Sequence, residues 1–336
     1  MTFQNTAKKI LNINELSLFA MWIVFIFVFW LINPNYLSVG NITNIFYSVS
    51  VMGTLAVGLT CLLISGKIDL STGSIGMMSG IFIAMLLSSD MPWVPALLIV
   101  LLFGAITGAV NAFFVNGLKI APFISTLAIK TIFSGIALLL TNGANIPIRD
   151  KSFLSLEATR IWIFPTSFII MIALLIIYGI ILAYTGFGRR IYITGGNAYA
   201  GRLAGIIPEK ITSILFINNG VLAALVGALF ASRMNMSSYT SVVGSDLDAI
   251  TAIVLGGVAF TGGSGKMSGV FLGIMLIASF NNGLVVSGLN FYYQVVAKGL
   301  LLIFALVLNY YRVIAKQNLL MQSANRKGLG VRDKGI

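Results

Sequence analysis

Charged residues within apolar sequence are the first feature of this chain that could carry chemistry. Asp69, Lys130, Asp246, Asp248 and Lys298 each lie inside or directly beside a long apolar stretch. A charge near the centre of a bilayer costs at least about 2.5 to 3.5 kcal/mol on insertion scales, so such side chains must face protein or water. We therefore treat them as candidates for a polar pathway through a membrane.

Two consecutive amides, Asn281 and Asn282, lie well inside another apolar stretch. An amide at that depth must hydrogen-bond to a neighbouring helix or to a polar molecule in a pore, and a hydroxyl-rich sugar is one such molecule. Asp69 and Ser71 directly precede a predicted helix, where these residue types are favoured as caps. Asp69 therefore has two open interpretations, a capping role and a role in translocation or gating, and Ser71 is a candidate for the second.

The residues that common catalytic sites require are missing. The chain has no His and one cysteine, Cys61, so familiar metal sites and His-based triads are excluded. Gly262–Lys266 resembles a phosphate-binding loop, but the GxxxxGK[ST] pattern needs Gly at position 260 and a hydroxyl at 267, where Phe260 and Met267 stand. We expect no enzyme, metal or cofactor, and any ATP that drives the protein must bind another subunit.

Membrane-spanning helices must position these residues. Hydrophobic residues make up 58% of the 336 and charged residues 9%, which is typical of a chain built for a bilayer. Apolar stretches of spanning length predict an all-α, polytopic fold of about ten helices, the eighth short enough to be broken or re-entrant. The predicted spans are Leu16–Ile32, Ile45–Ile64, Thr72–Ser88, Trp93–Val115, Pro122–Leu140, Ile163–Tyr184, Ile211–Ser232, Leu247–Thr261, Met267–Ser287 and Phe291–Tyr310.

The distribution of Lys and Arg predicts the orientation. With ten spans, fifteen of the 21 basic residues fall on one side, and only Arg149, Lys151, Arg160 and Arg233 fall on the other. The positive-inside rule then places both termini in the cytoplasm, and it explains the net charge of +12 without a nucleic-acid partner. We expect a cytoplasmic segment 1–15, a single transmembrane domain 16–310 and a basic cytoplasmic tail 311–336.

Two predicted loops are longer than a turn requires, residues 141–162 on the outer side and residues 185–210 on the inner side. The inner loop is the better candidate for contact with a partner. It contains a Gly195-Gly196-Asn197 start, a short helix-forming stretch, and Gly205 and Pro208 as stop signals. A short helix at the cytoplasmic end of the transmembrane domain could transmit the movement of a docked partner protein to that domain. An ordinary amphipathic connecting loop is the alternative.

Over nearly its whole length the sequence resembles a known family. These are the permease subunits of bacterial ABC importers for ribose, galactose, xylose and related compounds. Gly66–Ser74 is similar to that family's Gly-Ile-Asp-Leu-Ser-Val-Gly-Ser signature, with a difference around Lys67. Two departures are Ala198 and Asp246, where the family commonly has Glu, and the first puts a charge-based contact at that position in doubt. The other matching segments, in order, are Gly195–Ile206, Asp246–Gly257, Gly262–Gly265, Asn281–Leu284 and Tyr292–Gln294.

The resemblance implies a permease in the bacterial inner membrane that moves a monosaccharide, a ribose-like pentose or a hexose. It implies three partners: a second permease copy or a paralogue, a cytoplasmic ATPase with two nucleotide-binding domains, and an extracytoplasmic sugar-binding protein. The ATPase would contact Gly195, Gly196, Asn197, Arg202, Gly205 and Pro208, and the pathway or gate would use Asp69, Ser71, Asp246, Asp248, Asn281 and Asn282. The alternative is an ion-coupled secondary transporter or channel, which would not need an ATPase docking segment.

Overall fold

Long helices dominate the computed structural model, which describes residues 2–326 and the side chains of residues 15–307, 310 and 311. Apolar sequence in a membrane favours helices because each backbone polar group then pairs within its own segment. Seven helices of the described part are long and apolar enough to cross a membrane. They are α1 (Thr2–Ile32), α2 (Val39–Ile64), α4 (Trp93–Ala112), α5 (Pro122–Thr141), α7 (Thr166–Tyr184), α10 (Pro208–Met234) and α12 (Met267–Val286). For α1 this holds for the part from Glu15 onward, and for α4 it includes the short helix η2 (Phe113–Gly117) that continues it.

Three further helices fall where spans were predicted. They are α3 (Thr72–Ser88), α11 (Ser245–Leu255) and α13 (Phe291–Arg326), and the apolar part of α13 is Phe291–Val307. Each of the ten predicted spans thus contains a helix, while the number of crossings and the cytoplasmic position of both termini stay predictions. Residues 327–336 of the predicted basic tail lie outside the described residues.

The eighth predicted span, Leu247–Thr261, is wrong at its end. Its helix, α11, stops at Leu255 and has eleven residues, about 16 Å at the usual helical rise, against a hydrocarbon core of about 30 Å. Residues 256–266 continue without helix, and Gly257 and Gly262 adopt φ angles of +89° and +87°, which L side chains rarely adopt. The sequence before α11 follows the C-terminal end of α10, whereas Thr261 shares a pocket with Pro208 at the other end of α10. This course from one end of α10 toward the other favours a broken span over a re-entrant one, and the crossing itself stays a prediction.

Short elements connect the long helices. Two antiparallel strand pairs, β1 with β4 and β2 with β3, close loops at the end of the molecule where α10 finishes. The short helices are the 3-10 helix η1 (Pro34–Leu37), the π-helix η2 (Phe113–Gly117), α6 (Lys151–Ala158), α8 (Gly186–Gly196) and α9 (Ala198–Leu203). The strands are β1 (Ile146–Pro147), β2 (Arg160–Ile161), β3 (Phe164–Pro165) and β4 (Met236–Ser237).

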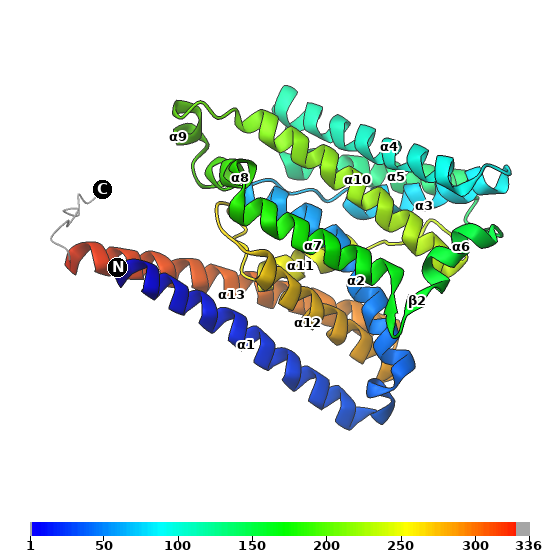
Figure 1. The fold of residues 1–336 in the computed structure, drawn as a ribbon, viewed down its shortest axis with the longest axis horizontal. Coiled ribbons are helices and arrows are strands. Elements are labelled where there is room, and N and C mark those ends of the chain that lie inside the picture. The colour runs from blue at the N-terminus through cyan, green and yellow to red at the C-terminus, as the bar shows by residue number, and fades with distance from the viewer. Residues whose placement is uncertain (1, 327–336) are drawn as a thin grey trace.

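The α2 helix lies at the centre of the bundle, and every residue from Met52 to Ile64 is buried. It contacts α7, α10, α11 and α12, while α10 packs against α3 and α4, and α1 packs against α12. In Figure 1 α1 runs along one edge of the molecule and α4 along the opposite edge. The N-terminal end of α1 and the C-terminal end of α13 lie at the end that also carries α8 and α9, which agrees with an even number of crossings.

Small residues bring the helices into backbone contact. A Cβ added to Gly104 would lie 2.3 Å from the carbonyl oxygen of Gly220, and one added to Gly227 would lie 1.9 Å from that of Gly76. A Cβ on Gly269 would likewise lie 2.1 Å from the carbonyl oxygen of Gly256. Such crossings are typical of membrane bundles, where close packing replaces the hydrophobic effect as the force between helices. The first two contacts hold α3, α4 and α10 as one tightly packed group, and the third joins α12 to the end of α11.

Candidate functional site

The N-terminal ends of two discontinuous helices, α3 and α11, meet inside the bundle. A Cβ added to Gly73, in the first turn of α3, would lie 3.3 Å from the carbonyl oxygen of Val242 and 3.4 Å from the carboxyl carbon of Asp246. Helix N-termini carry partial positive charge, which favours carboxylates placed in the first turn. Asp246 and Asp248 occupy the first turn of α11. Broken helices that meet in this way are typical of transporter interiors.

Asp69 lies just before α3, is fully buried, and takes part in a buried hydrogen-bond network. One carboxylate oxygen accepts from the backbone N–H and the hydroxyl of Ser71, at 2.9 and 2.5 Å. The other accepts from the side-chain amide of Asn219 on α10, at 2.9 Å, and that amide also donates to Thr72 at 3.0 Å. Asn111 on α4 donates to the Ser71 hydroxyl at 2.8 Å. The network fastens the non-helical approach to α3 onto α4 and α10.

Asn111 and Asn219 were not among the residues predicted from the sequence. Both are amides within predicted spans, and both are fully buried, so the argument used for Asn281 and Asn282 would have found them.

The two acidic residues of α11 form ion pairs with different helices. The ammonium group of Lys130 on α5 lies 2.5 Å from a carboxylate oxygen of Asp246, which is fully buried. The ammonium group of Lys298 on α13 lies 3.0 Å from Asp248, whose side chain is 18% exposed, while that of Lys298 is 38% exposed. Four of the five charges in or beside apolar sequence thus neutralise each other in pairs, which link α11 to α5 and to α13.

The two consecutive amides, Asn281 and Asn282, also have different partners. Asn281 donates to the carboxylate of Asp248 at 2.9 Å and so joins the Lys298 pair. Asn282 exchanges hydrogen bonds of 2.8 and 2.9 Å with Asn41 of α2. The predicted pathway residues therefore fall into four groups: the buried Asp69 network with Ser71, the buried Asp246 pair, the partly exposed cluster of Asp248, Asn281 and Lys298, and the Asn282 pair with Asn41.

The predicted contact segment, residues 185–210, forms two helices instead of one. Thr185 caps α8 through the backbone N–H of Gly188, and Asn197 caps α9 through that of Ala200. After α9, Gly205 has a φ of +76°, and Pro208 is the first residue of α10. Pro208 thus begins the next helix, because proline suits the first helical turn, where a backbone N–H is not needed.

Glycines attach the end of α8 to the centre of the bundle. A Cβ added to Gly195 would lie only 1.8 Å from the carbonyl oxygen of Ile64, the last residue of α2. That oxygen accepts a hydrogen bond of 2.8 Å from the backbone N–H of Gly263. A Cβ on Gly262 would lie 2.9 Å from the backbone of Gly66. We call this contact, made by residues 64–66, 195–196 and 262–263, the glycine joint.

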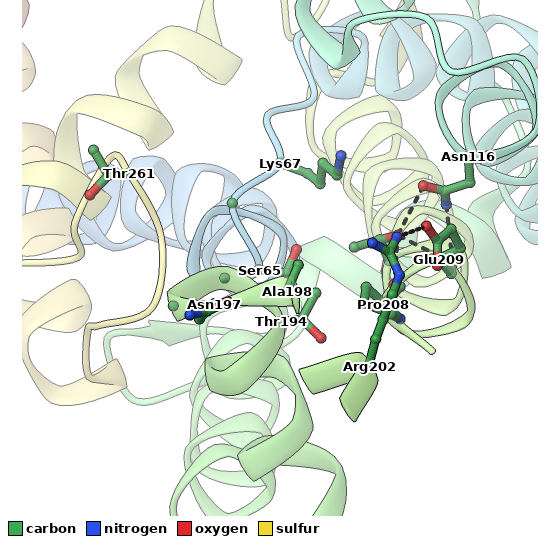
Figure 2. A pocket seen from close by; sticks show the side chains of 14 residues that line it. Ser65, Lys67, Asn116, Thr194, Asn197, Ala198, Arg202, Pro208, Glu209 and Thr261 are labelled. Carbon is green, nitrogen blue, oxygen red and sulfur yellow. Dashed lines mark hydrogen bonds and ion pairs between the residues drawn. The ribbon is translucent and has the colours of Figure 1, made fainter. Parts of the chain in front are cut away.

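An open pocket of about 310 Å³ lies beside the glycine joint. Its walls come from the α2–α3 segment, α8, α9 and the start of α10, and Thr261 adds a further wall. Figure 2 shows Arg202 of α9 reaching toward Glu209, with which it forms an ion pair. Lys119 contacts the same carboxylate at 3.4 Å. Among the described side chains no group of three or more Asp, Glu, Cys or His could hold a metal ion.

Comparison with known proteins decides the family. Residues 41–306 match the family described as the branched-chain amino acid transport system / permease component. The chain belongs to this permease family. The resemblance noted in the sequence is thereby confirmed, and this permease is a multi-pass inner-membrane protein and a transport subunit, not an enzyme.

Several curated permeases are similar to it over most of their length. The ribose import permease RbsC of Haemophilus influenzae is 34% identical over 303 residues, which cover 89% of this chain and 94% of the relative. RbsC of Bacillus subtilis is 33% identical over 88% of this chain and 92% of its own. The L-arabinose transport permease AraH of Escherichia coli is 32% identical over 84% and 87%. No solved structure matches this chain.

Proposed function

We propose that this permease moves a monosaccharide across the inner membrane as the channel-forming subunit of an ABC importer, with ribose as the first substrate to test. The names of the relatives support a pentose, since they transport ribose or arabinose. A cytoplasmic ATPase and an external binding protein are general partners of importers of this kind. The ATPase is needed because the chain has no nucleotide-binding motif of its own.

The cluster of Asp248, Asn281 and Lys298 is the observation that carries the proposed pathway. The Asp248–Lys298 ion pair and the Asn281 amide are partly exposed, although these residues lie in apolar sequence. Charged groups at membrane depth must face water or protein, since lipid tails cannot solvate them. A second copy of the permease placed against this face would enclose a polar passage between the two copies.

The buried residues take a supporting role in this proposal. Asp69 and Ser71 are closed off by Asn111 and Asn219, so they hold the start of α3 in place and do not contact the sugar. Asp246 fixes α11 to α5 through Lys130. Movement of α11 would change the position of Asp248 and thereby open or close the passage.

The α8–α9 segment is the proposed docking point of the ATPase, which we expect to bring two nucleotide-binding domains. Its Gly195 is packed against Ile64 and Gly263, so force applied to α8 reaches both α2 and the segment that follows α11. Binding of ATP would favour one arrangement of this joint, because the nucleotide binds the closed ATPase pair more tightly than the open one. Asn197, Arg202 and Gly205 shape the docking helix.

The proposal is tested by uptake into proteoliposomes. The permease is purified with its ATPase, reconstituted, and supplied with its binding protein and labelled ribose, arabinose or galactose. We expect uptake of one of these sugars that requires ATP and stops when the ATPase is omitted. Uptake driven by an ion gradient without ATP would instead identify a secondary transporter. As a residue-level check, Asp248→Asn should reduce uptake, whereas exchange of exposed Lys151 for Gln should not.

A further inference from the structure

Lys67 is a half-buried cation without an ion-pair partner among the described residues. It lines the pocket beside the glycine joint, together with Arg202 and Glu209. Glu209 is already contacted by Arg202 and by Lys119, so one carboxylate serves two cations. Figure 2 draws the ammonium group of Lys67 on the α2–α3 segment, with no ion pair to the residues around it. The pocket region therefore carries an excess of positive charge.

The surroundings of Lys67 disfavour an isolated charge. Burial lowers the pKa of this ammonium group, and the neighbouring charge of Lys119 lowers it further, while Glu209 raises it. A buried charge without a counter-ion is costly, and an added carboxylate would remove that cost.

The pocket opens on the face that carries α8 and α9. A partner docked on these helices would cover its mouth, and the volume of about 310 Å³ is ample for one carboxylate side chain. The ammonium group of Lys67 suits a carboxylate better than an apolar or cationic side chain. Gly66 and Gly195 are among the lining residues, so the pocket borders the glycine joint directly.

We propose that an Asp or Glu side chain of the ATPase subunit enters this pocket and pairs with Lys67. The inference rests on the proposed function, since it presupposes that an ATPase docks on this face. It adds a second, charge-based contact to the docking of α8 and α9, and it places that contact on the segment that leads from α2 to Asp69. The interaction would let the ATPase act on the α2–α3 segment as well as on α8.

Carbodiimide cross-linking of the assembled complex tests the contact. This reagent joins an amine to a carboxylate in ion-pair contact without adding a spacer. With the permease and the two-domain ATPase that co-purifies with it, we expect an amide bond between Lys67 and one Asp or Glu of the ATPase. A product joining Lys67 to Glu209 of the same chain, or no product at Lys67, would overturn the proposal.

Affinity measurements supply the matched control. Lys67→Gln should weaken binding of the purified ATPase about tenfold or more at low salt and flatten the salt dependence, and Lys67→Arg should restore most of the affinity. Lys119→Gln, which removes a more exposed cation of the same face, should change affinity less than about twofold. If the wild type binds the ATPase and Lys67→Gln binds equally well, only this inference fails. If the wild type binds no ATPase, the proposed function fails with it.

Discussion

The backbone N–H of Gly263 donates a hydrogen bond of 2.8 Å to the carbonyl oxygen of Ile64. This bond joins the segment that follows α11 to the last residue of α2, and Gly195 of α8 packs onto the same carbonyl group. Three segments far apart in the sequence thus share one contact at the end of the molecule where α9 lies.

Gly195→Val should break this contact. Even the Cβ alone would lie 1.8 Å from the Ile64 carbonyl oxygen, so α8 must move away from α2. We expect the ATPase to remain bound and to hydrolyse ATP while sugar uptake in proteoliposomes falls at least about tenfold. The neighbouring Gly196→Ala is the control, since its Cβ would lie 3.8 Å from the nearest atom, the Gly263 Cα. Wild-type uptake by Gly195→Val would remove the joint from the coupling mechanism.

Gly205 is constrained by its backbone and not by space. Nothing lies within 4 Å of a Cβ added there, but its φ of +76° is unfavourable for L side chains. Gly205→Val should strain the turn after α9 by about 1 to 2 kcal/mol or more and uncouple transport from ATP hydrolysis, with membrane insertion intact. Gly205→Asn, which tolerates positive φ better, should retain more coupling. The ratio of sugar moved to ATP hydrolysed measures the effect, and an unchanged ratio in the Val variant would argue against a docking role.

The two ion pairs of α11 should differ in their contribution to stability. Lys130→Met leaves the fully buried Asp246 without its counter-ion, which is expected to cost about 3 to 5 kcal/mol. Lys298→Met affects a more exposed pair and should cost about 1 kcal/mol or less. Chemical unfolding in detergent measures both free energies. The double variant Lys130→Met, Asp246→Asn should recover much of the loss, and equal losses for the two single variants would contradict the difference in burial.

Glu157 on α6 should make stability depend on pH. Its carboxyl is 2% exposed and accepts one hydrogen bond from Ser167, and burial raises its pKa from 4.5 to about 7. Between these values the folded state binds more protons than the unfolded state, so stability is greatest below about pH 4.5 and falls as the pH rises to about 7. The total change from this group is roughly 3 kcal/mol at most. Unfolding midpoints of the wild type and Glu157→Gln should diverge over this range, and parallel curves would refute the assignment.

Hydropathy and charge along the chain were sufficient for the positions of the helices. Thr72–Ser88 was predicted with the bounds that α3 has, and every other predicted span contains a helix. This succeeds because lipid selects for apolar length in each segment separately, which is a local property of the sequence. The end of α11 was missed because a run of apolar residues continues past Leu255, while the glycines that follow adopt turns that only the tertiary contacts select.

The sequence by itself determined which residues had to find partners, since charges and amides in apolar stretches cannot remain unpaired in lipid. Only the tertiary structure decided which residues those partners are. Asp246 and Asp248 are two positions apart on a helix and therefore point in nearly opposite directions, toward Lys130 and Lys298 respectively. Their partners lie 116 and 50 positions away along the chain, a separation set by how the helices pack and not by any local pattern.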